Sequence, residues 1–246
     1  GLTGYPWPWA KMNLATGGIH PGDFIGVWAI PKSMKTWVGL VVAESMFSAG
    51  RRVLVYSAEM LWPDIRRRMA SIGARVNYDR LKQGKLSPAE QQAVMEYIER
   101  TTAEGFPGEI FFTDATRLDG TPGGPADIRQ KMSVYKPHFV MLDSSYMLEL
   151  PGNGNQSALD WKVLASINRQ IKQIAKSTGV PILTIFQENE RAAIKYAKSR
   201  GTASIAMNTG LIMDFDVGIR VVFHKKRKEL SLHLAAARET SEEGFT

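Results

Sequence analysis

The chain has 246 residues, of which 44% are hydrophobic and 9% aromatic, with no cysteine and a formal charge of +7 at pH 7. This composition is typical of a globular protein large enough to bury a core, and it excludes disulfides, thiolate metal sites and a cysteine nucleophile. The four histidines do not have zinc-site spacing, no apolar run is long enough to cross a membrane, and the positive charge favours a polyanionic partner such as nucleic acid or a nucleotide.

The N-terminal nine residues contain no basic and apolar signal segment. We therefore expect a soluble protein of the cytoplasm with no membrane partner. The first predicted strand begins at residue 23. We accordingly assign residues 1–22 to a lead-in segment and residues 23–246 to a single domain.

Strands and helices alternate along the chain, because apolar runs bounded by turn residues are followed by apolar residues at helical spacing. The expected strands cover residues 23–30, 52–57, 109–113, 138–143 and 181–186. The expected helices cover residues 35–48, 61–72, 127–135 and 157–178, and another begins with a capping box at Ser87. Residues 217–223 and 229–236 predict a terminal pair of strands.

This alternation predicts an α/β fold in which a mostly parallel, twisted sheet carries helices on both faces and ends in a C-terminal antiparallel strand pair. Such folds bind ligands at the carboxyl ends of their strands. Polar loops at residues 151–156 and 188–209 follow two of the expected strands. Both loops are therefore placed where a ligand is expected.

A phosphate-binding loop belongs between the first strand and the first helix. Its pattern, G-x-x-x-x-G-K-[ST], uses glycines so that backbone amides can surround a phosphate. Lys35 and Thr36 are present, but Ala29 and Met34 stand where the glycines belong. On these residues alone, a Lys-Thr pair that opens an ordinary helix explains the pattern equally well.

Polar side chains at other strand ends favour the nucleotide site. Asp143 ends one apolar strand, Glu59 follows a second and Gln187 follows a third. Phosphoryl transfer needs a carboxylate that organises Mg²⁺ near the phosphate loop. A strand-end Asp also caps turns, but the combination of these groups with Lys35 and Thr36 predicts a nucleotide site at one edge of the sheet.

Four further segments occur in a characteristic order: residues 15–23 (ATGGIHPGD), 57–60 (SAEM), 84–87 (GKLS) and 187–191 (QENER). With the Asp143 strand, they make the chain resemble, over nearly its whole length, the ATPase domain of DnaB-type hexameric replicative helicases. The resemblance implies a RecA-like P-loop ATPase core.

The resemblance also implies ATP or another nucleoside triphosphate, together with Mg²⁺, as cofactors. Lys35 would contact the β- and γ-phosphates, and Thr36 and Asp143 would hold the metal. Glu59 would activate the attacking water, and Gln187 would sense the γ-phosphate. The expected nucleotide-binding loop comprises Ala29, Pro31, Lys32, Ser33, Met34, Lys35, Thr36 and Trp37.

Assembly into a ring, expected to be a hexamer, follows from the same resemblance. Arg238 matches the Arg of the family's Lys-x-Arg strand, which acts on the nucleotide of a neighbouring subunit, whereas Ala236 replaces the Lys. A strand-end cation facing solvent is the alternative interpretation of Arg238.

Single-stranded DNA is the expected partner. The family places DNA-contacting loops at residues 188–209, and this loop supplies cations for phosphate contacts: Arg191, Lys195, Lys198 and Arg200. A solvated loop is the alternative. The basic run at residues 225–228 is expected to be a solvated hairpin turn.

The chain departs from the family pattern at Met34, at Ala236 and at residues 144–146, where Ser-Ser-Tyr replaces Tyr-Leu-Gln. These departures indicate a divergent, phage-type member, for which the host cytoplasm is the expected location. The expected function is an NTP-driven DNA motor of replication. A DNA-binding protein with a decayed nucleotide site and a metal-dependent nuclease using Asp143 and Glu59 remain alternatives.

Two expectations concern packing. The helix that follows Glu59 carries three consecutive arginines, residues 66–68, which we expect on a solvated or subunit-facing surface. Five tryptophans lie on or beside predicted core elements, and we expect them to serve packing rather than ligand stacking: Trp7, Trp9, Trp28, Trp37 and Trp62.

Overall fold

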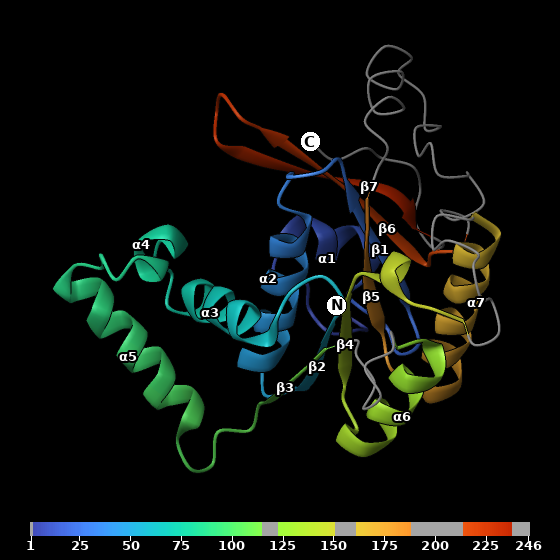
Figure 1. Cartoon of the computed structure of the whole chain (residues 1–246), viewed down its shortest axis with the longest axis horizontal. Coiled ribbons are helices and arrows are strands. Elements are labelled where there is room, and N and C mark those ends of the chain that lie inside the picture. The colour runs from blue at the N-terminus through green and yellow to red at the C-terminus, as the bar shows by residue number, and fades with distance from the viewer. Residues whose placement is uncertain (1, 115–122, 151–160, 188–213, 238–246) are drawn as a thin grey trace.

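A seven-stranded sheet forms the centre of the molecule (Figure 1) in the computed structural model, which describes residues 2–114, 123–150, 161–187 and 214–237. The strand order is β3-β2-β4-β5-β1-β6-β7. The strands are β1 (Phe24–Ala29), β2 (Arg52–Ser57), β3 (Glu109–Asp114), β4 (Phe139–Asp143), β5 (Ile182–Gln187), β6 (Val217–His224) and β7 (Glu229–Ala237). Neighbours from β3 to β6 pair in parallel, and β7 pairs with β6 antiparallel. The predicted fold class is therefore confirmed.

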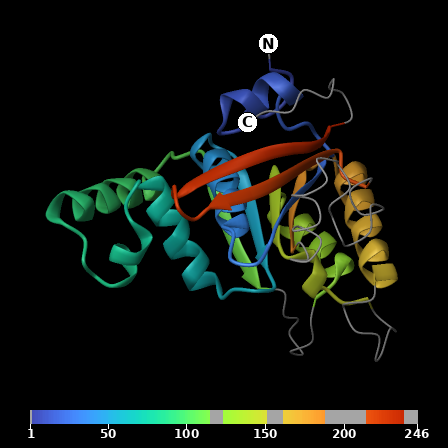
Figure 2. The same ribbon diagram turned by 90° about the horizontal axis from the view of Figure 1, so that it is seen from above.

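Helices cover both faces of the sheet (Figures 1 and 2). The helices are α1 (Ala10–Thr16), α2 (Lys35–Ser48), α3 (Trp62–Gly73), α4 (Tyr78–Lys82), α5 (Pro88–Thr102), α6 (Pro125–Tyr135) and α7 (Trp161–Thr178), with a 3-10 turn, η1 (Ser145–Met147). Of these, α4 and α5 lie to the side of the sheet, next to α3 (Figure 1). One core lies between the sheet and α1, α2 and α3, and a second lies between the sheet and α6 and α7. The central strands are apolar on both sides because both faces are covered.

The predicted elements match the structure closely. Both bounds of α2 and β2 agree with the prediction, and each other predicted end that the structure describes agrees or differs by one or two residues. The capping box at the start of α5 is present, since the Ser87 hydroxyl accepts from the Glu90 amide at 3.3 Å and the Glu90 carboxylate accepts from the Ser87 amide at 2.8 Å. Two short helices, α1 and α4, were not predicted. The predicted start of the last helix, at Ser157, lies outside the described residues.

The N-terminal segment packs on the sheet face that α2 covers. Trp7, Met12 and Ile19 belong to that core, and the Trp7 indole donates to the Thr16 hydroxyl at 2.9 Å. The boundary at residue 22 remains a prediction. In the described part of the chain, no helix combines the length and the hydropathy needed to cross a membrane.

The expectation for the tryptophans is wrong at Trp62, whose side chain is 47% exposed. The residue opens α3, five residues beyond the end of β2, so it lies past the edge of the sheet that would cover it. Trp7 and Trp28 are buried as predicted.

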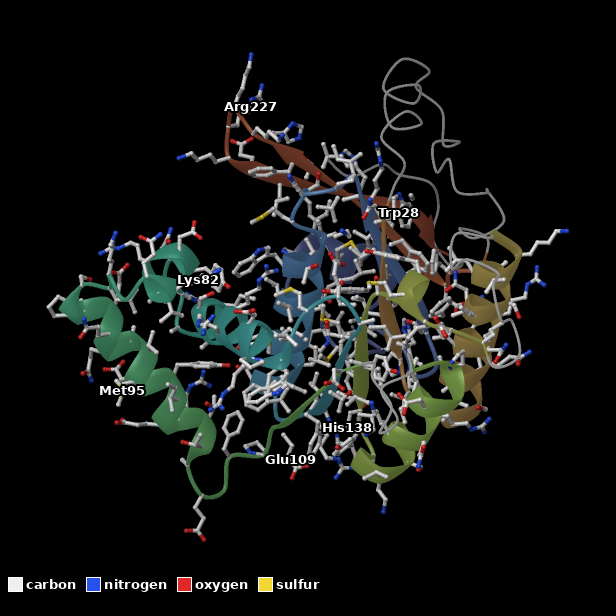
Figure 3. All side chains as sticks on the ribbon, in the orientation of Figure 1. Trp28, Lys82, Met95, Glu109, His138 and Arg227 are labelled. Atoms are coloured by element: carbon white, nitrogen blue, oxygen red, sulfur yellow. The ribbon has the colours of Figure 1, made fainter. Side chains whose placement is uncertain are left out.

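The β6–β7 hairpin extends beyond the sheet (Figure 1). The register pairs Trp28 of β1 with Arg220 of β6, so the last three residues of β6 continue past the end of β1 at Ala29. Residues 225–228 form the exposed turn, as predicted, and Figure 3 shows Arg227 at its tip.

Candidate nucleotide-binding site

Four neighbouring strands bring the predicted site residues to one edge of the sheet. The order β2-β4-β5-β1 places the chain after each strand beside the chain after the next. Ser57, two residues before Glu59, pairs with Asp143, and Ala29 at the start of the loop pairs with Gln187. Since carboxyl ends of parallel strands meet at the same edge, the structure brings Lys35, Thr36, Glu59, Asp143 and Gln187 together.

The loop between β1 and α2 has the backbone of an anion site. Lys32 and Met34 adopt left-handed conformations, with φ of 60° and 66°, and Met34 is the residue before the first turn of α2. The first amide groups of a helix have no intrahelical acceptors, and they favour an anion. The first turn of α2 contains no acidic residue that would compete for them.

Lys35 supplies the positive charge of this loop. Its side chain is only 7% exposed, which is unusual for a lysine. Within the described ranges it forms no ion pair. A buried ammonium group beside free helix amides is suited to bind a phosphate oxygen.

Asp143 is the most deeply buried carboxylate of the site, with 1% of the residue exposed. Burial, and after it the negative charge of Glu59, raise the pKa of this carboxyl to about 6. Thr36, Lys35 and Arg68 lower the pKa, but by less. Neither carboxylate oxygen has a hydrogen-bond partner of ordinary geometry among the described residues.

These properties fit a divalent cation. A buried carboxylate without such partners is costly unless a positive charge compensates it. Mg²⁺ prefers hard oxygen ligands and is bound through one or two protein oxygens plus the phosphates of a nucleotide. The Thr36 hydroxyl and the Asp143 carboxylate are such ligands, and each lies beside the anion loop.

A larger acidic metal centre is not found in the described part of the chain. No group of three or more His, Asp or Glu side chains there is arranged to hold a metal ion. The nuclease alternative therefore receives no support from the described residues.

Glu59 lies at the exposed rim of the site. Its backbone amide and that of Ala58 donate to the main-chain carbonyl of Asp143, at 3.3 and 2.6 Å. The Tyr146 hydroxyl donates to Oε2 of Glu59 at 3.1 Å. Burial raises the pKa of Tyr146 to about 12, and Glu59 contributes in the same direction. Tyr146 therefore stays a protonated donor at neutral pH.

Arg68 corrects the expectation for the three arginines. Its guanidinium carbon lies over the rings of Trp37 and Tyr78, 5.1 and 5.6 Å from the ring centroids. Its positive charge lowers the pKa of Asp143. The expectation was wrong here because Arg68 lies three residues after the buried Ile65, on the inward face of α3. That helical spacing was the available signal. Arg67 instead forms an exposed ion pair with Asp64.

The remaining predicted residues divide into two groups. Of the predicted loop, Ala29 and Ser33 are buried, Pro31, Lys32 and Met34 are exposed, and Trp37 packs edge-on against Tyr78. The residues predicted to contact DNA or a neighbouring nucleotide lie outside the described residues: Arg191, Lys195, Lys198, Arg200 and Arg238. Sequence reasoning missed Arg68, Tyr78 and the contact of Tyr146 with Glu59.

Known proteins resemble this chain in sequence. The replicative DNA helicase DnaB of Buchnera aphidicola subsp. Baizongia pistaciae is 24% identical over 223 residues, which cover 88% of this chain and 46% of that protein. The DnaB helicase of Haemophilus influenzae is 26% identical over 226 residues, covering 87% of this chain and 46% of its own length. The chain thus spans about half the length of these relatives.

Solved structures agree on the fold. A DnaB-like replicative helicase, described together with its interactions with primase, superimposes with a TM-score of 0.83 over 99% of this chain and 59% of its own. A second solved structure, described as an ATPase domain, superimposes with a TM-score of 0.82 over 99% of this chain and 87% of its own. Both are 19% identical, so they establish the fold alone. The family described as "DnaB-like helicase C terminal domain" matches residues 4–219, most of the sequence. The chain belongs to this family.

Proposed function

We propose that the chain is the ATP-hydrolysing domain of a replicative DNA helicase, which binds a nucleoside triphosphate with Mg²⁺. One observation carries the proposal: the buried Lys35 lies at the same edge of the sheet as the buried carboxylate of Asp143, whose oxygens have no hydrogen-bond partner of ordinary geometry among the described residues. Both lie beside a loop in which Lys32 and Met34 are left-handed. Family membership supports it.

The residues divide the work of hydrolysis. Lys35 and the first amides of α2 bind the phosphates. Thr36 and Asp143 would hold Mg²⁺, which would supply positive charge against the phosphates. Glu59 orients the attacking water and takes its proton. Gln187, exposed at the end of β5, contacts the terminal phosphate. Arg68 adds positive charge from the α3 side of the site.

We further propose that the domain works on single-stranded DNA as a hexameric ring. The relatives are replicative helicases, and the chain carries a positive charge that suits a polyanion. Arg191, Lys195, Lys198 and Arg200 are the proposed DNA contacts, and Arg238 is the proposed contribution to the neighbour's nucleotide. The proposed setting is the cytoplasm, or that of the host if a phage carries the gene.

A single reaction tests the proposal: ATP hydrolysis in Mg²⁺, with and without single-stranded DNA, followed by electrophoresis of that DNA. Hydrolysis that DNA stimulates, with the DNA left intact, is the expected result. Lys35→Ala should abolish hydrolysis in a folded protein. Lys82→Ala is the matched control, since Lys82 is an exposed lysine at the end of α4 and has no role in the proposed site (Figure 3).

Other results would identify the alternatives. DNA binding without hydrolysis would indicate a decayed nucleotide site, and degraded DNA would indicate a nuclease. Hydrolysis that survives Lys35→Ala at the wild-type rate would contradict the assignment of the site.

A further inference from the structure

Tyr146 lies at the rim of the site, outside the phosphate loop. It belongs to η1, three residues after Asp143, and its ring packs against the core under α6 and α7. Its hydroxyl reaches across to Glu59, which follows a different strand, and donates to Oε2 at 3.1 Å. The proposed base therefore has a direct side-chain contact from a second element.

Glu59 needs such a partner because little else holds its side chain. The residue is exposed, and its backbone amide makes the hydrogen bond that fixes it near Asp143. A glutamate side chain has several rotatable bonds, so ordering it costs conformational entropy. A hydrogen bond to a charged group is strong enough to offset that cost.

The second carboxylate oxygen of Glu59, Oε1, is not used by this contact. Oε1 of Glu59 accepts no hydrogen bond from the described residues. Tyr146 is anchored by its ring, so its hydroxyl offers a fixed point rather than a second flexible arm. One oxygen is thus held, while the second has no hydrogen-bond partner among the described residues.

We infer that Tyr146 is a positioning residue, which holds Oε2 of Glu59 so that Oε1 is aimed at the attacking water. The inference rests on the proposed function. Tyr146 does not belong to the phosphate loop, so it acts on the chemical step and leaves nucleotide binding unchanged. A residue needed only for stability would not separate these two effects.

Tyr146→Phe tests this role, because it keeps the ring and its packing and removes only the hydroxyl. We expect kcat for ATP to fall about tenfold, which corresponds to ~1.4 kcal/mol of transition-state stabilisation. The KM for ATP and the thermal midpoint should not change. The control is Tyr135→Phe, which removes a hydroxyl from a ring stacked on Phe111 at 4.6 Å, away from Glu59.

The contact itself is tested without any turnover. In protein labelled at the tyrosine ζ-carbon, the spectra of Tyr146→Phe and Tyr135→Phe assign the two resonances. Glu59→Gln removes the charged acceptor, so it should shift the Tyr146 resonance and leave that of Tyr135 in place.

Each result decides between distinct conclusions. An active wild-type protein with an unchanged kcat in Tyr146→Phe overturns the inference and leaves the proposed function standing. An inactive wild-type protein overturns the proposed function and the catalytic role of Tyr146 with it. A Tyr146 resonance that does not respond to Glu59→Gln overturns the contact.

Discussion

Met34 holds the backbone angles that its glycine counterpart would adopt without strain. Its φ of 66° lies in the left-handed region, where a side chain with a Cβ costs roughly 1–2 kcal/mol. The loop keeps the shape of a phosphate cradle despite this cost. The strain arises because a residue with a Cβ occupies a positive φ, so replacing Met34 with glycine should release it.

Met34→Gly is expected to stabilise the protein by about 0.5–1 kcal/mol, since the relief of strain exceeds the ~0.5–1 kcal/mol that glycine adds to the entropy of the unfolded chain. Affinity for ATP should rise as well, measured by calorimetry, with stability taken from thermal unfolding. Met34→Ala keeps a Cβ and serves as the control. A decrease of both affinity and stability in Met34→Gly would instead show that the Met34 side chain is part of an adapted loop.

Asp143 links the nucleotide site to the stability of the fold. Its pKa of about 6 is above its ordinary value of 3.8, so the folded protein binds more protons than the unfolded chain between these values. The free energy of unfolding of the nucleotide-free protein should therefore fall as the pH rises through this window. The penalty is fully present at neutral pH.

Asp143→Asn should remove this penalty, because the amide carries no charge to desolvate. At pH 7.5 we expect the variant to be more stable than the wild type by about 1–3 kcal/mol, with the difference shrinking towards pH 4, in urea unfolding curves. The control is Asp114→Asn, at the exposed end of β3. A variant less stable than the wild type at pH 7.5 would show that burial does not strain this carboxylate.

The segment that follows β5 starts at the nucleotide site. Gln187 ends β5, between β4 and β1, and the basic residues of the proposed DNA loop come next in the chain. If both proposed contacts are made, a short stretch of chain connects the terminal phosphate to DNA. That placement makes the loop the element through which we expect hydrolysis and DNA binding to be coupled.

Lys195→Ala combined with Lys198→Ala should weaken binding of single-stranded DNA at every sequence tested, because phosphate contacts carry no sequence information. The slope of log affinity against log salt should decrease by about 0.7 for each phosphate contact removed, measured by fluorescence anisotropy across a salt series. The control is Lys82→Ala combined with Lys85→Ala, which removes the same charge from the end of α4 and the turn that follows it. If affinity and slope are unaltered, the DNA site lies elsewhere, and the turn at residues 225–228 is the first place to test.

In the proposed ring, the nucleotide site is complete only when subunits assemble. The chain spans about half the length of its DnaB relatives, and in the proposed ring each nucleotide takes one cation from a neighbouring subunit. Such a cation stabilises the transition state of phosphoryl transfer by a factor of about 10³ to 10⁵. Arg238 is the proposed residue, without the Lys that usually accompanies it.

Arg238→Ala should bind ATP normally and lose most of its turnover, since binding uses Lys35 and Thr36 of the same subunit. Mixing it with Lys35→Ala at high protein concentration, with nucleotide and DNA present, should restore part of the activity, because some interfaces then pair an intact loop with an intact Arg238. The measurement is ATP hydrolysis against mixing ratio. A wild-type protein that hydrolyses ATP at its full rate as a monomer in ultracentrifugation would rule out the shared site.

Local pattern was sufficient for the elements and for most of the proposed active site. The bounds of α2 and β2, the capping box of α5 and the polar residues after the strands all follow from hydrophobic period and turn chemistry, which act over a few residues. Lys35, Thr36, Glu59, Asp143 and Gln187 could be predicted because parallel strands present their carboxyl ends at one edge. The short helices α1 and α4 have too few residues to show a period.

Only the tertiary structure decided which of these residues are neighbours and what surrounds them. The order β2-β4-β5-β1 depends on pairings between distant segments, which leave no mark in local spacing. The inward turn of Arg68 onto Trp37, the contact of Tyr146 with Glu59 and the burial of the Asp143 carboxylate result from packing between different elements. Each depends on which side chains the fold brings within contact distance. Those distances are determined by the packing of all the elements around the core.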